Sequence, residues 1–403
     1  MNSRWQLKYI KRRREIVGTF MRHGLGYFMQ RFGLRDRTAL TSSRGINKPQ
    51  KSQYLLAGNL REAFVELGPT FVKLGQLLST RPDLLPPVFI EELEKLQDKV
   101  SPISFEELSR VLAQELGPLD KIFAEFNPQP LAAASIGQVH RARLLTGEEV
   151  IVKVQRPGIE AKVRNDLEIL KGLARISELR SADARQLGIL AMVDDYAKTL
   201  LRELDYEREA RNTERVYKNF AEDKRVVIPK VYQQYSSPRV LIEEFIPGIK
   251  LSDIEEIEAR GWSRRKISAL GTEAFLSQIM LHGFFQADPH PGNILVVDED
   301  KIAFIDFGEI GYLSDLRLTY VGQLLVTINS NNPYSAISVL RDMGILADVE
   351  DTEDFSEDFA DLVDSLYSSS MGGLNMKRMR TEIMELTYRY QLKVPAYLTS
   401  LMK

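Results

Sequence analysis

The chain has 403 residues, more than one ordinary domain, and its composition of 44% hydrophobic and 27% charged residues is that of a globular protein with a large core. It contains no cysteine, which excludes disulfides, thiolate zinc sites and cysteine nucleophiles and leaves carboxylates, lysines and metals to carry any chemistry. The net charge of −2 is unevenly distributed, because residues 1–51 sum to +11 and the remainder to −13. An anionic surface is therefore the expected partner of the N-terminus.

The basic N-terminal segment, residues 1–50, interleaves lysines and arginines with apolar residues such as Ile10 and Phe20. This composition is typical of an amphipathic helix on a membrane surface, but an arm that packs on its own domain explains it equally well. Nucleic acid is not an expected partner, since no nucleic-acid-binding motif accompanies the charge. No window reaches the roughly 18 apolar residues of a membrane span, and the start lacks the features of a secretory signal. The expected location is cytoplasmic, peripheral to the inner face of the membrane.

Hydrophobic periodicity divides the rest of the chain into helical and mixed parts. Helices are predicted at residues 56–67, 71–78, 88–97 and 104–116, so that about the first 125 residues are helical. Strands at 137–144 and 150–155 precede helices at 159–179 and 190–219 and strands at 226–232 and 240–245. Beyond Pro247-Gly248 the pattern is helical apart from one hairpin. The fold class is α+β, with a helical extension at 51–127, a small mixed lobe at 128–247 and a helical lobe at 248–403.

The clearest chemical signal is Asp288-Pro-His-Pro-Gly-Asn293, which is followed by Asp306-Phe-Gly308. The step from Asp288 to Asn293 is the spacing of the catalytic loop in phosphoryl transfer, where the acid meets the attacking group and the amide holds metal. Residues 294–297 and 301–305 predict a hairpin that folds Asn293 back towards Asp306. A kinase-type nucleotide site is therefore predicted, with Asn293 and Asp306 as magnesium ligands.

A nucleotide site also needs a loop over the phosphates and a cation. The alanine-rich loop, residues 132–139, occupies the place of a glycine-rich loop; its candidate nucleotide-binding residues are Ala132, Ala133, Ala134, Ser135, Gly137 and Val139. Lys153 shares one face of its predicted strand with Ile151 and Gln155. A rim lysine with a solvated ammonium is the ordinary interpretation of Lys153 alone. With the catalytic loop present, we expect Lys153 to contact phosphate.

Carboxylates on a predicted helix at 203–212 are candidate counter-ions for Lys153. At about 100° per residue, Asp205 and Glu209 lie on one face of that helix while Glu203 points away from both. One carboxylate can pair with Lys153 and another can meet a different element, although such charges are usually a solvated surface. The strand that ends at Pro247-Gly248 is a candidate hinge, whose backbone at Glu244 and Ile246 would bind an adenine.

In combination these motifs resemble the UbiB/ADCK/AarF family of atypical protein-kinase-like proteins, over about residues 50–330. The distinguishing feature lies outside the kinase core, where Lys73-Leu-Gly75-Gln76 matches the family's K-x-G-Q helical extension. The other motifs follow in the family's order. The resemblance implies a protein-kinase-like two-lobe fold with an N-terminal helical extension that carries the K-x-G-Q motif.

The resemblance also implies roles for the catalytic residues. Lys153 would pair with Glu209 and contact the phosphates of ATP. Asn293 and Asp306 would hold Mg²⁺, and Asp288 would take the position of the catalytic base.

For the helical extension, the resemblance implies that the helix carrying Lys73 and Gln76 lies over the active site. Lys73 would engage Glu203 or Asp205, and the helix would obstruct a protein substrate. One departure is Gln286, which occupies the position where the family usually has histidine. This substitution puts the rigidity of the catalytic loop in doubt. Another is that many members end in membrane-spanning helices, of which this sequence gives no sign.

The leading hypothesis is an ATP- and magnesium-dependent atypical kinase or ATPase at a membrane surface. By resemblance it would support isoprenoid-quinone biosynthesis of the ubiquinone type, with an isoprenoid lipid or quinone precursor as partner. The alternative is a nucleotide-gated lipid-binding scaffold or chaperone with little phosphotransfer, favoured by the alanine-rich loop and the covered site. A conventional protein kinase is disfavoured, because the sequence has neither a glycine-rich loop nor Ala-Pro-Glu after Gly308. The sequence indicates no oligomeric state.

Overall fold

A computed structural model of the protein describes residues 3–26, 50–96, 101–346, 349, 352–368 and 376–401. The basic N-terminal segment is described only in part, since its residues 27–49 lie outside this set. The chain forms two compact units: unit 1 comprises Met1–Gly75, Leu96–Ala274 and Pro289–Ile310, and unit 2 comprises Gln76–Lys95, Phe275–Asp288 and Gly311–Lys403. None of the described helices is long and apolar enough to cross a membrane.

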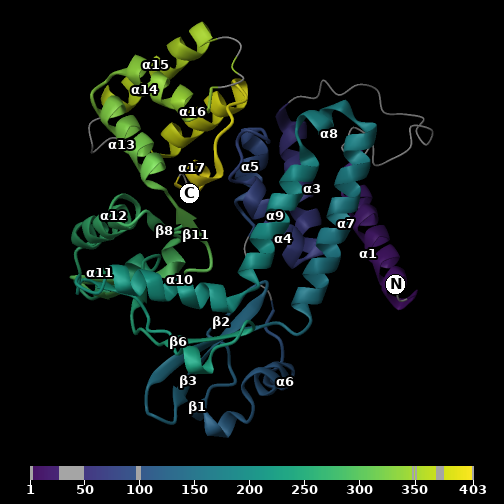
Figure 1. The fold of residues 1–403 in the computed structure, drawn as a ribbon, viewed down its shortest axis with the longest axis vertical. Coiled ribbons are helices and arrows are strands. Elements are labelled where there is room, and N and C mark those ends of the chain that lie inside the picture. The colour runs from purple at the N-terminus through teal and green to yellow at the C-terminus, as the bar shows by residue number, and fades with distance from the viewer. Residues whose placement is uncertain are drawn as a thin grey trace. The chain divides into compact units, whose positions relative to one another are not determined.

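The helices are labelled in Figure 1. Unit 1 holds α1 Ser3–Arg22, α3 Gln50–Leu67, α6 Phe105–Leu116, α7 Ile159–Arg180, α8 Ala182–Gln186, α9 Ile189–Glu203, α10 Tyr206–Asn219 and α11 Ile254–Ala259. Unit 2 holds α5 Pro87–Leu93, α13 Asp315–Asn329, α14 Pro333–Asp342, α15 Thr352–Ser368, α16 Met376–Arg389 and α17 Ala396–Leu401. The boundary between the units falls within α4 Pro69–Leu78 and α12 Arg264–Met280. Short 3₁₀ turns are η2 Leu119–Lys121, η3 Gln233–Tyr235 and η4 Pro291–Asn293.

A five-stranded antiparallel sheet forms the centre of unit 1, with the order β1-β3-β4-β6 and β2 paired to β3. The strands are β1 Phe123–Phe126, β2 Ala132–Ala133, β3 Gly137–Leu144, β4 Glu149–Gln155 and β6 Val240–Glu244. Val150, Val152 and Val154 of β4 are buried in one core cluster with Leu108 and Leu112 of α6. Because side chains alternate along a strand, Lys153 lies on the opposite face of β4.

The second sheet of unit 1 has the order β5-β10-β9-β7 and contains the predicted hairpin. Its strands are β5 Val226–Val227, β7 Ile249–Lys250, β9 Ile294–Asp298 and β10 Lys301–Phe304. β9 and β10 are antiparallel, and Asp298 accepts the backbone N–H of Asp300 in the turn between them, at 2.9 Å. The hairpin is thereby confirmed. The strand predicted at 226–232 is shorter than expected, because Pro229 has no N–H to continue the ladder.

Two predictions about the helices before residue 220 are wrong. The chain is not helical to about residue 125, because residues 123–126 form β1, which pairs with β3. The continuous helix at 190–219 is broken into α9 and α10. Asp205 caps α10 by accepting the backbone N–H of Arg208 at 3.3 Å, a role that aspartate takes more readily than a position inside a helix. Glu203 therefore diverges from Glu209 because two helices meet, and not because one helix turns.

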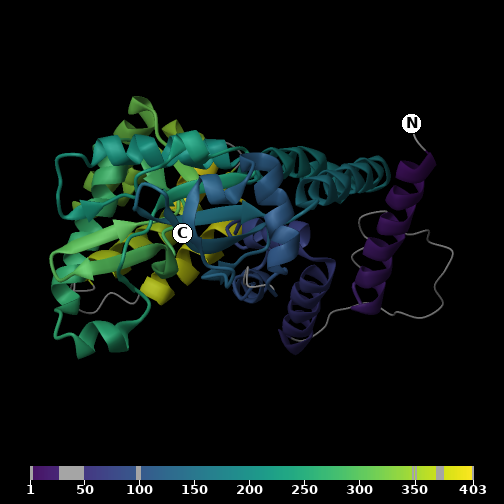
Figure 2. The same cartoon turned by 90° about the horizontal axis from the view of Figure 1, so that it is seen from below.

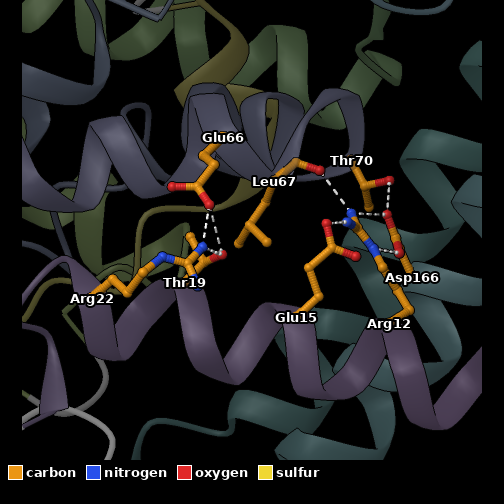
Figure 3. Close-up of polar contacts among 8 residues, drawn as sticks. All are labelled: Arg12, Glu15, Thr19, Arg22, Glu66, Leu67, Thr70 and Asp166. Carbon is orange, nitrogen blue, oxygen red and sulfur yellow. Dashed lines mark hydrogen bonds and ion pairs between the residues drawn. The ribbon is translucent and has the colours of Figure 1, made fainter.

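Helix α1 packs on the other helices of unit 1 through a buried ion pair. Figures 1 and 2 show α1 at the edge of this unit, away from its sheet. Arg12 donates to both carboxylate oxygens of Asp166 on α7, at 2.8 and 3.0 Å, and to the carbonyl of Leu67 at 2.7 Å (Figure 3). The Asp166 side chain is 0% exposed and also accepts the Thr70 hydroxyl at 3.0 Å. Arg12 thus connects α1 to α7 and α3, and Asp166 connects α7 to α4 through Thr70.

A second contact fixes the end of α1. Glu66 of α3 accepts a hydrogen bond from the Thr19 hydroxyl at 3.1 Å and forms an ion pair with Arg22 (Figure 3). Ile16, which lies between Arg12 and Thr19 in the sequence, is fully buried. The inner face of α1 therefore packs on its own domain, which was one of the two interpretations of the basic segment. Its outer face still presents apolar residues, since Leu7 is 67% exposed.

Unit 2 is mainly helical. Ile337 and Leu340 of α14 pack with Phe355, Phe359 and Val363 of α15 in its core. The prediction that only the hairpin interrupts the helices beyond residue 248 is wrong. Among the described residues, three further strands lie there: β7 in unit 1, and β8 Phe284–Gln286 and β11 Ile310–Tyr312, which form a two-stranded sheet. These strands have two or three residues, which is too short for a period-two pattern.

Candidate nucleotide site

Lys153 is held within unit 1 by oxygen atoms from neighbouring elements. Its Nζ lies 2.5 Å from Oε1 of Glu209 on α10 and 3.3 Å from the carbonyl oxygen of Ile305, just after β10. Only 12% of the Lys153 side chain and 9% of the Glu209 side chain are exposed. The ion pair implied by the resemblance is therefore present. Lys153 is not a solvated lysine at the rim, because its side chain is largely buried. Glu209 supplies the counter-ion that a buried ammonium requires.

Glu243 is a second acid beside Lys153 that sequence analysis missed. It lies on β6 opposite Ile151 of β4 and is fully buried. Its Oε2 is 3.1 Å from Nζ of Lys153, and its Oε1 accepts the Thr213 hydroxyl from α10 at 3.1 Å. Residues 240–242 are all apolar and fully buried, so no alternation of apolar and polar residues indicates the face of β6 on which Glu243 lies.

Helix α10 also holds the Asp306-Phe-Gly segment. The Asn212 side chain donates to the carbonyl of Phe307 at 2.9 Å, and Phe307 is fully buried. Gly308 lies close to Glu209, since a Cβ added to it would be 3.7 Å from Glu209 Oε2. The same helix that pairs with Lys153 thus fixes the backbone next to Asp306.

The hairpin brings the two predicted magnesium ligands to the same end of a pair of strands. Asn293 precedes β9, and its carbonyl accepts the N–H of Ile305, the residue before Asp306, at 3.1 Å. Oδ1 of Asp306 accepts the backbone N–H of Gly308 at 3.0 Å, which orients the carboxylate. Both residues are partly exposed.

The alanine-rich loop is a tight connection between β2 and β3. Its six candidate residues are Ala132 and Ala133 on β2, Ala134 and Ser135 in the turn, and Gly137 and Val139 on β3. The N–H of Ala134 donates to the carbonyl of Gly137 at 2.8 Å. Ser135 is buried, and within the described part of the chain its hydroxyl has no hydrogen-bond partner.

Gly137 is required by crowding rather than by an unusual backbone angle. A Cβ at this position would lie 2.4 Å from the hydroxyl of Tyr206 and 2.7 Å from the carbonyl of Val154. Its φ does not fall in the left-handed region. Gly137 is therefore the one glycine of a usual glycine-rich loop that this loop keeps, at a position with no room for a side chain.

The predicted hinge offers one uncommitted backbone position. The N–H of Glu244 donates to the carbonyl of Lys230 at 2.8 Å, and its side chain accepts the Lys230 N–H at 3.2 Å. Ile246 packs on Leu295, and in the described residues its backbone N–H and carbonyl form no hydrogen bond. Of the two hinge residues, Ile246 is thus the one whose N–H is not already used by the fold.

The K-x-G-Q lysine is connected to the strand that carries Lys153. Nζ of Lys73 lies 3.4 Å from Oε2 of Glu203, and their side chains are 17% and 10% exposed. The next residue, Leu204, accepts the side-chain amide of Gln155 at 2.6 Å. Gln155 follows two residues after Lys153 on the same face of β4. Of the two acids offered by the resemblance, the structure pairs Glu203 with Lys73.

The remaining residues of this group have other contacts. Asp205 caps α10 and pairs with Arg211 at 3.6 Å. Gly75 permits close packing, because an added Cβ would lie 2.2 Å from the Leu96 side chain. Gln76 follows on α4 as the first residue of unit 2 and is half-buried.

Asp288 belongs to unit 2, where it is exposed and follows buried Ala287 at the end of β8. Gln286, which replaces the family's usual histidine, is buried in β8, and its N–H donates to the side chain of Gln278 at 3.0 Å. The glutamine is therefore anchored by its backbone within unit 2.

Three carboxylates act on one ammonium in unit 1. Burial alone lowers the pKa of Lys153, but Glu209, Glu243 and Asp306 together raise it well above its ordinary value. Burial, together with the negative charges of Asp306 and Glu243, raises the pKa of Glu209 to about 7, although Lys153 acts to lower it. The group carries more negative than positive charge, which a divalent cation would neutralise.

Magnesium fits this donor set. In the described part of the chain, no group of three or more histidine and acidic side chains is arranged to hold a metal ion. Mg²⁺ does not require one, since it commonly binds one or two protein oxygens together with water and phosphate oxygens. Asn293 and Asp306 would supply an amide oxygen and a carboxylate oxygen. When bound, the ion would neutralise charge on the phosphates.

The α+β fold and the buried lysine–glutamate pair define a protein of kinase-like class. Residues 95–338, more than half of the chain, match the ABC1 atypical kinase-like domain. The chain belongs to this family, the ABC1/UbiB group, and its resemblance to the family is confirmed.

Relatives in two organisms illustrate this membership. The chain is 37% identical over 346 residues to the Synechocystis protein named Uncharacterized protein sll1770, covering 85% of this chain and 59% of the relative. It is 39% identical over 312 residues to the Arabidopsis thaliana protein ACTIVITY OF BC1 COMPLEX KINASE 7, chloroplastic, covering 77% and 45%. The chain thus spans about half the length of the curated relatives it matches.

A solved structure has a similar fold. The Rv3197–erythromycin complex from Mycobacterium tuberculosis aligns with a TM-score of 0.54 and 23% identity, covering 83% of this chain and 92% of that one. At this identity the similarity concerns the fold alone, and it agrees with the kinase-like fold that the sequence predicts.

Proposed function

We propose that this chain binds ATP with Mg²⁺ and acts as an atypical kinase or ATPase. Lys153 contacts the phosphates, Asn293 and Asp306 hold the ion, and Asp288 is the catalytic base. The observation that carries the proposal is the burial of Lys153 against Glu209, with its ammonium also bonded to the carbonyl that precedes Asp306. A buried lysine with a helical glutamate partner, next to an acid and an amide, is the arrangement used to bind and polarise a triphosphate.

Magnesium-dependent ATP turnover by the full chain tests the proposal. We expect Asp306→Asn and Lys153→Met each to lower turnover by at least about a hundredfold, because each removes a charge that acts on the phosphates. Glu149→Gln is the matched control, since Glu149 is an exposed acid on β4 that pairs with Arg141 at the surface. Full activity in Asp306→Asn would refute the metal assignment.

The second candidate is a nucleotide-gated lipid-binding scaffold. Alanines at 132–134 favour it, because methyl groups restrict the approach of the loop backbone to phosphates. ATP-induced thermal stabilisation measured beside product formation separates the two functions. Stabilisation with no turnover, even with lipid present, supports the scaffold.

The substrate context is an isoprenoid lipid or quinone precursor at an anionic membrane, in support of ubiquinone-type biosynthesis. The outer face of α1 motivates the membrane: Leu7 and Ile10 are 67% and 46% exposed beside exposed Lys11, Arg13 and Arg14. We expect the chain to bind anionic vesicles, less so at high salt, and Leu7→Glu with Ile10→Glu to lose binding. Equal binding by this variant would remove the membrane role of α1. Mass spectrometry of lipids after ATP turnover identifies any phosphate acceptor.

A further inference from the structure

Glu243 has no place in the proposed function, yet it is the acid buried most completely beside Lys153. It is 0% exposed, compared with 7% for Glu209. The Thr213 hydroxyl of α10 lies 3.1 Å from its Oε1 and shares its proton between this oxygen and the carbonyl of Glu209 at 3.0 Å. Its position is set by the register of β6 on β4, in which Leu241 lies opposite Lys153 and Glu243 follows two residues on, along the same face.

The other oxygen of Glu243 is the unusual one. Oε2 lies 3.1 Å from the Lys153 ammonium but, within the described residues, accepts no hydrogen bond. The hydrogen bonds of Lys153 go instead to Glu209 and to the carbonyl of Ile305. A buried carboxylate oxygen with no aligned donor is unfavourable, because burial removes its hydration without replacing it. Glu243 therefore holds Lys153 through an ion pair that lacks a well-aligned hydrogen bond.

We propose that Glu243 is a positioning residue that competes with the nucleotide phosphates for Lys153 and makes binding of ATP depend on magnesium. This inference rests on the proposed function, since it requires that Lys153 contact phosphate. Glu243 adds a third negative charge to Glu209 and Asp306 around one ammonium. Bare ATP, a polyanion, meets this excess charge directly, whereas the magnesium complex carries less negative charge into the same site.

Substitutions in this chain can weaken or strengthen the competition between Glu243 and phosphate for Lys153. Glu243→Gln keeps the shape and removes the charge, so Lys153 becomes available to phosphate. Thr213→Val removes the hydroxyl that holds Oε1 and leaves the carboxylate to turn towards Lys153. Lys153→Met removes the phosphate contact itself, and Glu149→Gln, which removes an exposed acid from the same strand, is the control for loss of one charge.

The experiment measures the dissociation constant of the full chain for ATP by calorimetry, once with magnesium and once with EDTA. We expect Glu243→Gln to bind ATP in EDTA about tenfold more tightly and the magnesium complex about twofold more tightly, which narrows the ratio of the two constants. Thr213→Val is expected to weaken binding in EDTA about threefold, and Glu149→Gln to leave both constants unchanged.

The results separate failure of this inference from failure of the proposed function. If Lys153→Met weakens binding but Glu243→Gln leaves the ratio of the two constants unchanged, Glu243 is a structural residue and the inference is overturned. If Lys153→Met binds ATP as the unmodified chain does, the proposed function itself is overturned. Thermal unfolding without nucleotide is the folding control, and Glu243→Gln is expected to unfold at no lower temperature, since it relieves an unsatisfied buried charge.

Discussion

Lys73 and Glu203 form an ion pair, with Nζ and Oε2 3.4 Å apart, that links the K-x-G-Q helix to the last residue of α9. Leu204, the residue after Glu203, accepts a hydrogen bond at its carbonyl from the side-chain amide of Gln155. This hydrogen bond links the ion pair to β4, the strand that carries Lys153. Because both side chains are largely buried, we expect the ion pair to couple α4 to the candidate nucleotide site through the break between α9 and α10.

A double-mutant cycle on this pair tests the coupling. We expect Lys73→Met to destabilise unit 1 by about 2 kcal/mol, because it leaves the mostly buried Glu203 carboxylate without its ammonium. Adding Glu203→Gln should restore at least half of the loss, as measured by urea unfolding. Additive single effects would show that the two side chains do not interact in solution.

The second prediction concerns Arg12 and Asp166 (Figure 3). Arg12→Met leaves a carboxylate that is 0% exposed and that, among the described residues, keeps a hydrogen bond from the Thr70 hydroxyl alone, at an expected cost of about 3 kcal/mol. Hydrogen exchange of the α1 amides should accelerate strongly, since the helix loses its main polar anchor.

Arg13→Met is the control for this prediction, because Arg13 is an exposed neighbour on the same helix and its loss should change stability by less than about 0.5 kcal/mol. Adding Asp166→Asn to Arg12→Met should recover part of the loss. Unchanged exchange of α1 in Arg12→Met would mean that the apolar inner face alone holds the helix.

The third prediction is that Gly137→Ala destabilises unit 1 by about 2–3 kcal/mol, because the new methyl would meet the Tyr206 hydroxyl and the Val154 carbonyl. Tyr206→Phe should relieve only part of this, since the carbonyl stays in place. Gly271→Ala, in α12 with nothing within 4 Å of the added Cβ, should instead stabilise by about 0.5–1 kcal/mol. Equal urea midpoints for Gly137→Ala and the unmodified chain would contradict the crowding.

The sequence predicted those parts of the fold in which local pattern and tertiary structure agree. The alternation at residues 137–144 and 150–155 corresponds to β3 and β4, and the two acidic motifs enclose the hairpin of β9 and β10. These strands are long enough for a period of two to be visible and are paired with neighbours in sequence. The roles of Asp288, Asn293 and Asp306 remain predictions.

What the sequence could not give depends on register and on distant partners. Glu243 faces Lys153 only because β6 pairs with β4 in one particular register, and a shift by one residue would turn it away. Arg12 and Asp166 lie 154 residues apart, and each is an ordinary charged residue in an amphipathic helix. The break at Asp205 could have been inferred, because aspartate before a helical run is a common N-cap.

The last prediction is a loss of stability in mild acid that originates at His140 on β3. His140 is fully buried, and its Nδ1 lies 2.9 Å from the carbonyl of Asn127 and its Nε2 3.3 Å from the Gln138 amide nitrogen. The neutral ring, donating from Nδ1 and accepting at Nε2, satisfies both contacts, whereas the charged ring would leave Nε2–H facing an amide donor. Burial lowers the pKa of His140 below its ordinary value.

The sign of the pH dependence follows from this lowered pKa. Below about pH 6.5 the unfolded chain takes up a proton at His140 that the folded chain resists, so the stability present at pH 7.5 is lost as the pH falls. The raised pKa of Glu209 has the opposite effect, because folded Glu209 takes up a proton at a higher pH than the unfolded chain does. The test is therefore comparative: between about pH 7.5 and 5.5 we expect the urea midpoint of the unmodified chain to fall relative to that of His140→Gln. Some slope should remain, because burial also lowers the pKa of His282 in unit 2. An identical slope in His140→Gln would show that the buried imidazole does not set the acid sensitivity of unit 1.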